Sequence, residues 1–193
     1  STSNTTETEV LIIKTIKPLF HAQAGAASPS IMNKPESSMN SLNRILLVED
    51  SPSDAGLALH ALAEHNLDQD VLHLPDGAQA LDYLFRRGEF SGRAPGNPAL
   101  VLLDLKMPKV DGLEVLSQIK GEPALRTIPV VVMTSSRERR DVEAAYRLGV
   151  NAYVVKPMKF TNFVDAVKRV GAFWAMLNEP PPASTPVADE PKI

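Results

Sequence analysis

Five short and largely aliphatic runs recur between residues 44 and 177, and longer amphipathic stretches separate them. The runs are Ile45–Val48, Val71–Leu74, Leu100–Leu103, Val130–Met133 and Ala152–Val155. Runs of this kind, with few alternating polar residues, are typical of parallel strands that are buried on both faces. The pattern therefore predicts a five-stranded parallel sheet.

The stretches between and after these runs carry apolar residues at helical spacing. The sets are Ala55, Ala58, Leu59 and Leu62; Ala78, Leu81, Leu84 and Phe85; Leu113, Leu116 and Ile119; Val142, Ala145, Tyr146 and Gly149; and Phe160, Phe163, Val164, Val167, Gly171 and Trp174. Ser51 suits the N-cap of the first helix, with Pro52 at its first position and Asp54 reaching back to the cap. Five strands alternating with five helices predict a doubly wound α/β domain, since right-handed crossovers place helices on both faces.

Composition separates this predicted domain, residues 41–177, from its two flanks. Residues 1–40 are rich in Ser, Thr and Asn, which predicts a poorly ordered leader; the alternative is an annotation artefact upstream of a natural start at Met32 or Met39. Residues 178–193 contain five prolines, so an extended or disordered tail is expected.

Bulk composition excludes several classes of function. The 193 residues carry a net charge of −3, which gives no electrostatic case for nucleic-acid binding. Cysteine is absent, so disulfides and thiolate metal sites are excluded and a reducing compartment is favoured. No apolar stretch approaches the roughly 20 residues that span a bilayer. We therefore expect a cytoplasmic protein without a membrane or nucleic-acid partner.

Polar side chains directly follow four of the five predicted strands. Glu49 and Asp50 follow the first strand, Asp104 the third, Thr134 the fourth and Lys156 the fifth. Taken singly, each has a plain structural explanation as a helix cap, a turn residue or a surface residue. In open parallel sheets, however, binding sites form beyond the carboxyl ends of the strands. Capping does not predict three carboxylates, a hydroxyl and a lysine at one edge, so we favour a functional site.

The chemistry of this group points to phosphoryl transfer. Neighbouring carboxylates repel one another unless cations relieve them, and a hard divalent ion with oxygen ligands is suited to that role. Glu49, Asp50 and Asp104 are thus candidate Mg²⁺ ligands. A carboxylate can also be a nucleophile toward phosphorus, in a reaction that depends mainly on positioning and charge neutralisation. Lys156 would then pair with the phosphoryl oxygens and Thr134 would donate a hydrogen bond to one of them.

Four segments resemble the receiver domain of two-component response regulators: "ILLVEDSPSD", "VLLDLKMPKVDG", "PVVVMTSS" and "AYVVKP". The resemblance covers roughly residues 44–177. It implies the flavodoxin-like strand order 2-1-3-4-5. It also implies that Asp104 accepts a phosphoryl group from a phosphohistidine of a sensor histidine kinase.

The resemblance assigns further roles around Asp104. It implies that Mg²⁺ is bound by Asp50, Asp104 and the backbone carbonyl of Lys106, with Glu49 acting through water. Thr134 and Tyr153 would form the switch, Lys156 would pair with the phosphoryl group, and the bond from Lys156 to Pro157 would be cis.

Two positions depart from the common pattern of the family. Lys106 lies two residues after Asp104, where a small polar residue is frequent, and Ser136 lies two residues after Thr134. In the family, both positions tune the access of water to the phosphorylated aspartate, so the lifetime of the phosphorylated state does not follow from the resemblance. Lys106 is also a potential competitor of Mg²⁺ for the carboxylates.

A more specific resemblance concerns the loop "RRGEFSGRAPGNPA" and the ending "FTNFVDAVKRVGAFWAMLNEPPP". Both are similar to the small regulators that pair with cyanobacterial and bacterial phytochromes. This favours a bacteriophytochrome as the sensor kinase and a signalling switch without a DNA-binding output domain, which catalyses only its own phosphorylation and dephosphorylation. The alternative is a degenerate receiver that acts as a non-phosphorylated adaptor. An aspartate-nucleophile phosphatase is disfavoured, because Lys106 stands where the general acid would be.

The last predicted helix carries a second apolar stripe. Its residues are Ala166, Val170, Phe173 and Leu177. Exposed apolar surface usually marks an interaction site, and two-fold pairing is the commonest closed assembly. We therefore expect a homodimer whose interface includes Val170, Phe173 and Leu177; the alternative is that residues 1–40 cover this stripe.

Overall fold

A parallel five-stranded sheet forms the centre of the computed structural model, which describes residues 45–179. The strands are β1 (Ile45–Val48), β2 (Val71–Leu74), β3 (Leu100–Leu103), β4 (Val130–Thr134) and β5 (Ala152–Val155). All neighbours are parallel and the order is β2-β1-β3-β4-β5. The predicted flavodoxin-like, doubly wound fold is therefore confirmed.

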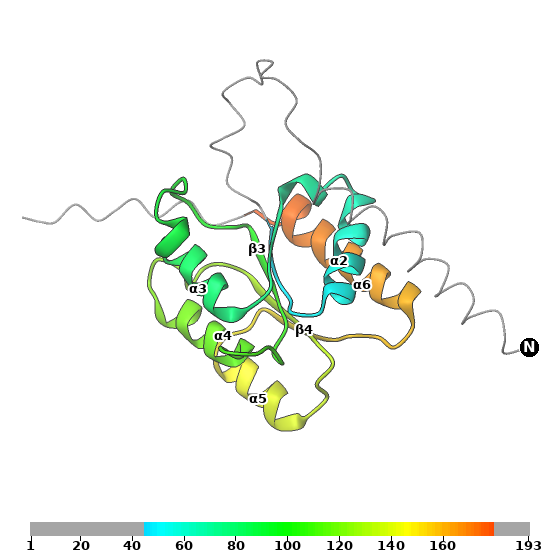
Figure 1. Ribbon diagram of the computed structural model, residues 1–193. Helices are drawn as coiled ribbons and strands as arrows, with labels where there is room; N and C mark the ends of the chain where they lie inside the picture. The colour runs from blue at the N-terminus through cyan, green and yellow to red at the C-terminus, as the bar shows by residue number, and fades with distance from the viewer. Residues whose placement is uncertain (1–44, 180–193) are drawn as a thin grey trace, which may run out of the picture. The chain divides into compact units, whose positions relative to one another are not determined.

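Five α-helices cover the two faces of the sheet (Figure 1). They are α2 (Pro52–Ala63), α3 (Gly77–Leu84), α4 (Gly112–Gly121), α5 (Arg139–Arg147) and α6 (Phe160–Ala172). Helices α2 and α6 pack together on one face, and α3, α4 and α5 lie on the other. Two short 3₁₀ turns, η2 (Asp68–Asp70) and η3 (Gly88–Phe90), precede β2 and the loop to β3.

Alternate residues of each central strand enter two separate cores, which explains why the runs are aliphatic throughout. In β1, Leu46 and Val48 join the core under α3, α4 and α5, whereas Ile45 and Leu47 join the core under α2 and α6. This follows from the two-residue period of strand side chains. The edge strand β5 is only partly buried along its length, since a neighbouring strand covers one of its sides only.

The start of α2 is partly as predicted. Ser51 is the N-cap and accepts a hydrogen bond from the Asp54 N–H at 3.4 Å. The expected return contact from the Asp54 carboxylate to the cap is wrong, because this carboxylate accepts a hydrogen bond from Lys156 instead. An ammonium is a stronger partner than a neutral backbone N–H.

A glycine sets the close approach of α4 to the end of β3. A Cβ added at Gly112 would lie 2.2 Å from the carbonyl oxygen of Asp104 and 2.7 Å from the Cα of Leu105. The Gly112 N–H donates to the Leu105 carbonyl at 3.0 Å. The "VDG" segment therefore folds back against the residue that follows β3.

Two expectations about the helices need correction. Tyr146 was expected on the apolar face of its helix, but its side chain is 55% exposed, because α5 turns Asp141 and Ala145 toward the domain. The last helix does not continue unchanged to Leu177. It ends at Ala172 and passes into a π-helical turn, η4 (Phe173–Leu177), in which the Asn178 N–H donates to the Phe173 carbonyl at 2.8 Å.

The two predicted flanks are almost entirely beyond these residues. The leader, residues 1–40, lies outside the described residues, and the tail predicted at 178–193 is described only as far as residue 179. Within residues 45–179, no helix combines the length and the apolar character needed to cross a membrane.

Candidate functional site

The polar residues predicted to meet at the carboxyl edge of the sheet do meet there. Glu49 and Asp50 follow β1, Asp104 follows β3, Thr134 ends β4 and Lys156 follows β5. Glu49, Asp104 and Thr134 are buried, and Asp50 is exposed.

Backbone hydrogen bonds continue the sheet by one residue beyond these strands, so that Glu49, Asp104 and Lys156 are aligned along its carboxyl edge. They run from the Glu49 N–H to the Leu74 carbonyl (3.1 Å), from the Asp104 N–H to the Val48 carbonyl (3.0 Å) and from the Lys156 N–H to the Thr134 carbonyl (2.8 Å). The side chains of the site are thus positioned by the sheet itself.

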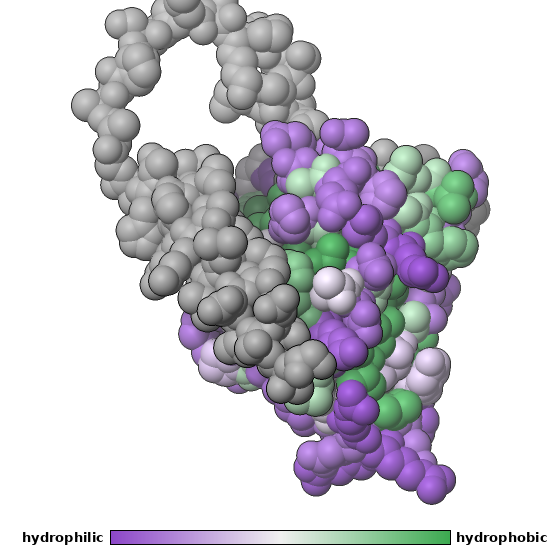
Figure 2. All heavy atoms as spheres, turned by 90° about the vertical axis from the view of Figure 1, so that its right-hand side faces the viewer, coloured by the Kyte–Doolittle hydropathy of each residue, from purple (hydrophilic) through white to green (hydrophobic). Residues whose placement is uncertain are grey.

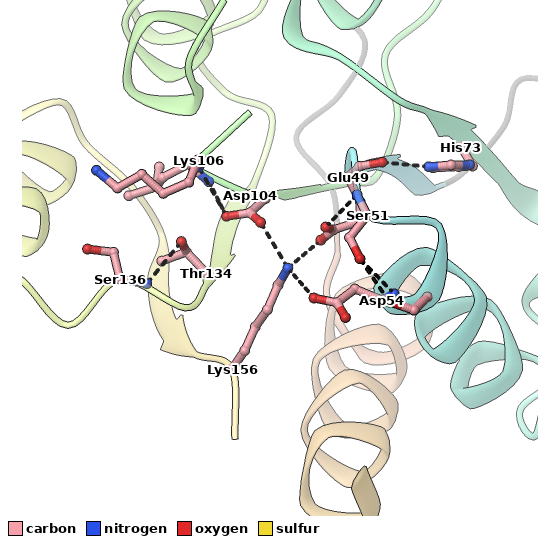
Figure 3. Close-up of polar contacts among 11 residues, drawn as sticks. Glu49, Ser51, Asp54, His73, Asp104, Lys106, Thr134, Ser136 and Lys156 are labelled. Carbon is pink, nitrogen blue, oxygen red and sulfur yellow. Dashed lines mark hydrogen bonds and ion pairs between the residues drawn. The ribbon is translucent and has the colours of Figure 1, made fainter. Parts of the chain in front are cut away.

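Lys156 holds three carboxylates together (Figure 3). Its Nζ donates to Glu49 Oε2 at 2.6 Å, to Asp54 Oδ2 at 2.8 Å and to Asp104 Oδ2 at 2.9 Å. The side chains of Lys156, Glu49 and Asp104 are at most 8% exposed. Charges this deeply buried are stable only when they are paired.

The pKa values of the paired groups reflect both burial and this pairing. Burial raises the pKa of Glu49 to about 7, although its hydrogen bond with Lys156 acts in the opposite direction. Burial alone would lower the pKa of Lys156, but hydrogen bonds to Asp54, Glu49 and Asp104 together raise it above its usual value. Lys156 therefore stays charged at neutral pH.

Asp104 is held through both of its carboxylate oxygens. Oδ1 accepts hydrogen bonds from the backbone N–H of Leu105 at 2.6 Å and of Lys106 at 3.2 Å. Oδ2 accepts from Lys156. The carboxylate is thus fixed in orientation at the end of its strand, as a nucleophile or a metal ligand requires.

Glu49, Asp50 and Asp104 form a group that could hold a metal ion. Each offers a carboxylate oxygen, and these oxygens all lie within 4.8 Å of one another. Carboxylate oxygens are the ligands that Mg²⁺ prefers, so the donor set fits the predicted cation. The predicted fourth ligand, the backbone carbonyl of Lys106, stays a prediction.

The predicted switch residues Thr134 and Tyr153 both contact Ser136. Thr134 Oγ1 accepts a hydrogen bond from the Ser136 N–H at 3.3 Å, and the Tyr153 hydroxyl donates to the Ser136 carbonyl at 3.1 Å. The Ser136 backbone therefore lies between the hydroxyl of the site and the aromatic ring on β5.

Lys106 does not compete for the acidic group in this structure. Its ammonium pairs with Asp141 Oδ2 at 2.7 Å. Figure 3 shows the Lys106 side chain extending away from Lys156, although its backbone N–H reaches Asp104.

Three residues that the sequence did not assign to the site contact it. His73 Nε2–H donates to the Glu49 carbonyl at 2.8 Å, so the second strand, after which no site residue was predicted, also contacts the site. A polar residue within an otherwise aliphatic run was the available signal. For Asp54 the sequence predicts only a role at the start of its helix, and it predicts no role for Asp141, which lies in the first turn of α5.

The expected cis bond between Lys156 and Pro157 is also a correction, since no peptide bond among the described residues is cis. The trans form is the intrinsically preferred one, even before proline.

Comparisons with known proteins identify the family to which this fold belongs. The model of the response regulator receiver domain matches residues 45–168. The chain therefore belongs to the response regulator receiver domain family of two-component signal transduction. The response regulator Rcp1 of Synechocystis sp. is 42% identical over 130 residues, which cover 67% of this chain and 87% of Rcp1.

Solved structures of phytochrome-associated regulators are similar to this chain. The bacteriophytochrome response regulator RtBRR is 58% identical, with a TM-score of 0.59, covering 75% of this chain and 87% of RtBRR. The phosphorylated cyanobacterial phytochrome response regulator RcpA is 37% identical, with a TM-score of 0.68, covering 74% of this chain and all of RcpA. Rcp1 in its Mn²⁺-bound form is 40% identical, with a TM-score of 0.67, covering 72% of this chain and 98% of Rcp1. The predicted resemblance to such regulators is confirmed.

Proposed function

We propose that Asp104 accepts a phosphoryl group from a phosphohistidine of a sensor histidine kinase and that the protein acts as a phosphorylation-dependent switch. The observation that carries this proposal is the buried Asp104 carboxylate, 2.9 Å from the Lys156 ammonium and grouped with Glu49 and Asp50. The phosphorylated state of RcpA supports the same reaction here.

In the proposed reaction, a carboxylate oxygen of Asp104 attacks phosphorus and forms a P–O bond. The P–N bond to the kinase imidazole breaks, and its electron pair leaves with the imidazole nitrogen. The Lys156 ammonium is already beside the reacting carboxylate and then pairs with the phosphoryl oxygens. Thr134 supplies a hydrogen bond to one of these oxygens. Such groups lower the barrier by positioning and by neutralising charge.

Glu49, Asp50, Asp104 and the backbone carbonyl of Lys106 would hold Mg²⁺. The bound ion supplies positive charge that offsets the repulsion between the acceptor carboxylate and the incoming phosphoryl group. The group of three carboxylates supports this assignment, as does the Mn²⁺-bound form of Rcp1.

The kinase partner that we propose is a bacteriophytochrome. The phytochrome regulators RcpA and RtBRR, which are similar over about three quarters of this chain, support this assignment. Thr134 and Tyr153 would transmit phosphorylation through the Ser136 segment. We propose that the protein acts in the cytoplasm and that neither nucleic acid nor a membrane is its partner.

Electrophoresis in Phos-tag gels tests the proposal after incubation with acetyl phosphate. The wild type is expected to form a retarded species in Mg²⁺ but not in EDTA, and Asp104→Asn is expected to form none. A wild type that takes up no phosphoryl group would favour the adaptor function instead. A retarded Asp104→Asn variant would reject the assignment of the acceptor.

We also propose that the C-terminal segment forms a homodimer interface. Phe173 is 50% exposed and Leu177 is 77% exposed, while Val170 is half-buried beside them. Figure 2, which views the domain from the side of α2 and α6, shows hydrophobic side chains gathered between hydrophilic ones. Exposed apolar residues at adjacent helical positions favour a contact with a second copy.

A further inference from the structure

Asp141, in the first turn of α5, joins two loops of the carboxyl edge through one carboxylate oxygen. Its Oδ2 accepts a hydrogen bond from Ser136 Oγ at 2.6 Å and pairs with Lys106 Nζ at 2.7 Å. Asp141 is only 5% exposed. Lys106 belongs to the loop after β3 and Ser136 to the loop after β4. One buried side chain thus ties both loops to α5.

Both partners of Asp141 also contact the candidate site through their backbones. The Lys106 N–H donates to Asp104 Oδ1 at 3.2 Å, and the Ser136 N–H donates to Thr134 Oγ1 at 3.3 Å. The side chains of Lys106 and Ser136 point away from Lys156 (Figure 3). Asp141 therefore holds the side chains of two residues whose backbones support the acceptor carboxylate and the site hydroxyl.

The position of the Lys106 ammonium matters because Lys106 lies two residues from Asp104. Its side chain is 52% exposed and flexible, so its orientation depends on its pairing with Asp141. Without that partner, the ammonium could turn toward the Asp104 carboxylate. A second ammonium there would reduce the negative charge that attracts a divalent cation.

We propose that Asp141 is a positioning residue that keeps the Lys106 ammonium away from the acidic group of Glu49, Asp50 and Asp104. This inference rests on the proposed function, because it concerns metal binding at that same group. The pairing explains where the ammonium of Lys106 lies, two residues after Asp104. It also gives a role to Asp141, which is buried and makes no described contact with Glu49, Asp50 or Asp104.

An ordinary helix-start role would be the simpler explanation, since an acid in the first turn interacts favourably with the helix dipole. That role needs neither burial nor a partner from outside the helix, and Asp141 has both. The two explanations differ in one measurable respect. A dipole role does not depend on the side chain at position 106, whereas positioning of Lys106 does.

Titration calorimetry with Mg²⁺ on the full chain tests the inference through a double-variant cycle. The proteins are the wild type, Asp141→Ala, Lys106→Met and the double variant. Residues that support metal ligands from outside typically change metal affinity by about 10- to 100-fold when altered. We expect Asp141→Ala to weaken Mg²⁺ binding by about tenfold. The double variant should bind Mg²⁺ with the affinity of Lys106→Met, because no ammonium at position 106 is left for Asp141 to hold.

Further variants separate the possible failures. Asp141→Asn removes the charge that pairs with Lys106 and keeps an acceptor for Ser136, so it decides the question if Asp141→Ala does not fold. Arg140→Met removes a neighbouring cation that is 4.0 Å from Asp141 Oδ1 and mostly exposed, and it should leave the affinity unchanged. If Asp141→Ala weakens Mg²⁺ binding equally in the wild type and in Lys106→Met, or does not weaken it in either protein, the inference about Asp141 is wrong. Either result would leave the proposed metal site itself in place. If Asp104→Ala also leaves Mg²⁺ affinity unchanged, the proposed metal site itself is wrong.

Discussion

The ionisation of Glu49 gives a quantitative test of how the carboxyl edge is built. Burial raises its pKa from 4.5 to about 7, although the hydrogen bond with Lys156 opposes the change. A group with a raised pKa in the folded protein stabilises the fold below its unfolded pKa. That contribution is lost as the pH rises through the folded pKa. Glu49 should therefore favour the folded state more at pH 5 than at pH 8.

The size of the effect follows from the two pKa values. At about 1.4 kcal/mol per pKa unit, a rise from 4.5 to about 7 corresponds to about 3 kcal/mol over the full titration. About 2 kcal/mol of this falls between pH 5 and pH 8. Glu49→Gln removes the ionisation and nearly keeps the size of the side chain. The free energy of unfolding of the wild type, relative to this variant, should thus fall by about 2 kcal/mol from pH 5 to pH 8.

Urea unfolding in EDTA measures this difference through the fluorescence of Trp174, the one tryptophan of the chain. Glu89→Gln makes the same chemical change at an exposed carboxylate outside the site and serves as the control. Saturating Mg²⁺ should reduce the effect at Glu49, because a bound cation favours the ionised form. An equal difference between wild type and Glu49→Gln at both pH values would refute the reasoning.

Three further predictions follow from the site, the backbone and the C-terminal surface. Lys156→Ala should stay folded but lose about 3 kcal/mol of unfolding free energy at neutral pH, because removing one partner of a buried ion pair leaves charge uncompensated. It should also abolish the NMR shifts of Tyr153 on addition of beryllofluoride, and an unchanged response would contradict the role of the lysine. Gly112→Ala should destabilise by about 1–3 kcal/mol in thermal unfolding, because its Cβ would overlap the backbone after β3. A Cβ added at Gly121 meets nothing within 4 Å, so Gly121→Ala should be neutral or stabilising. If Gly121→Ala destabilised the protein more than Gly112→Ala, the packing described for Gly112 would be wrong. Phe173→Asp should convert a dimer into a monomer in sedimentation, whereas a monomeric wild type, or a dimer indifferent to the change, would reject the proposed interface.

The fold could be predicted from the sequence because its strongest signals are local. Each strand appears as an aliphatic run, and the predicted boundaries of β1, β2, β3 and β5 agree with the structure. The meeting of Asp104, Thr134 and Lys156 followed from geometry, since parallel strands bring their carboxyl ends to one edge. Residues on different strands could therefore be grouped without any knowledge of contacts.

The contacts of Asp54, His73 and Asp141 could not be predicted in the same way. Their partners are distant in sequence: Lys156 lies 102 residues from Asp54, for example. A helix-start acid has several acceptable partners, and which one it binds depends on where a cation from another loop is placed. Such choices are made by tertiary packing, which periodicity does not report.

The most direct test of the central assignment is chemical mapping of the phosphorylated residue. The protein is incubated with acetyl phosphate and Mg²⁺, the acyl phosphate is reduced with borohydride, and the peptides are sequenced by mass spectrometry. The account predicts that homoserine replaces aspartate at position 104 and that Asp111→Asn, a variant at an exposed helix cap, gives the same product. Reduction at Glu49 or Asp50 instead, or an unmodified Asp104 in a protein that takes up phosphate, would contradict it.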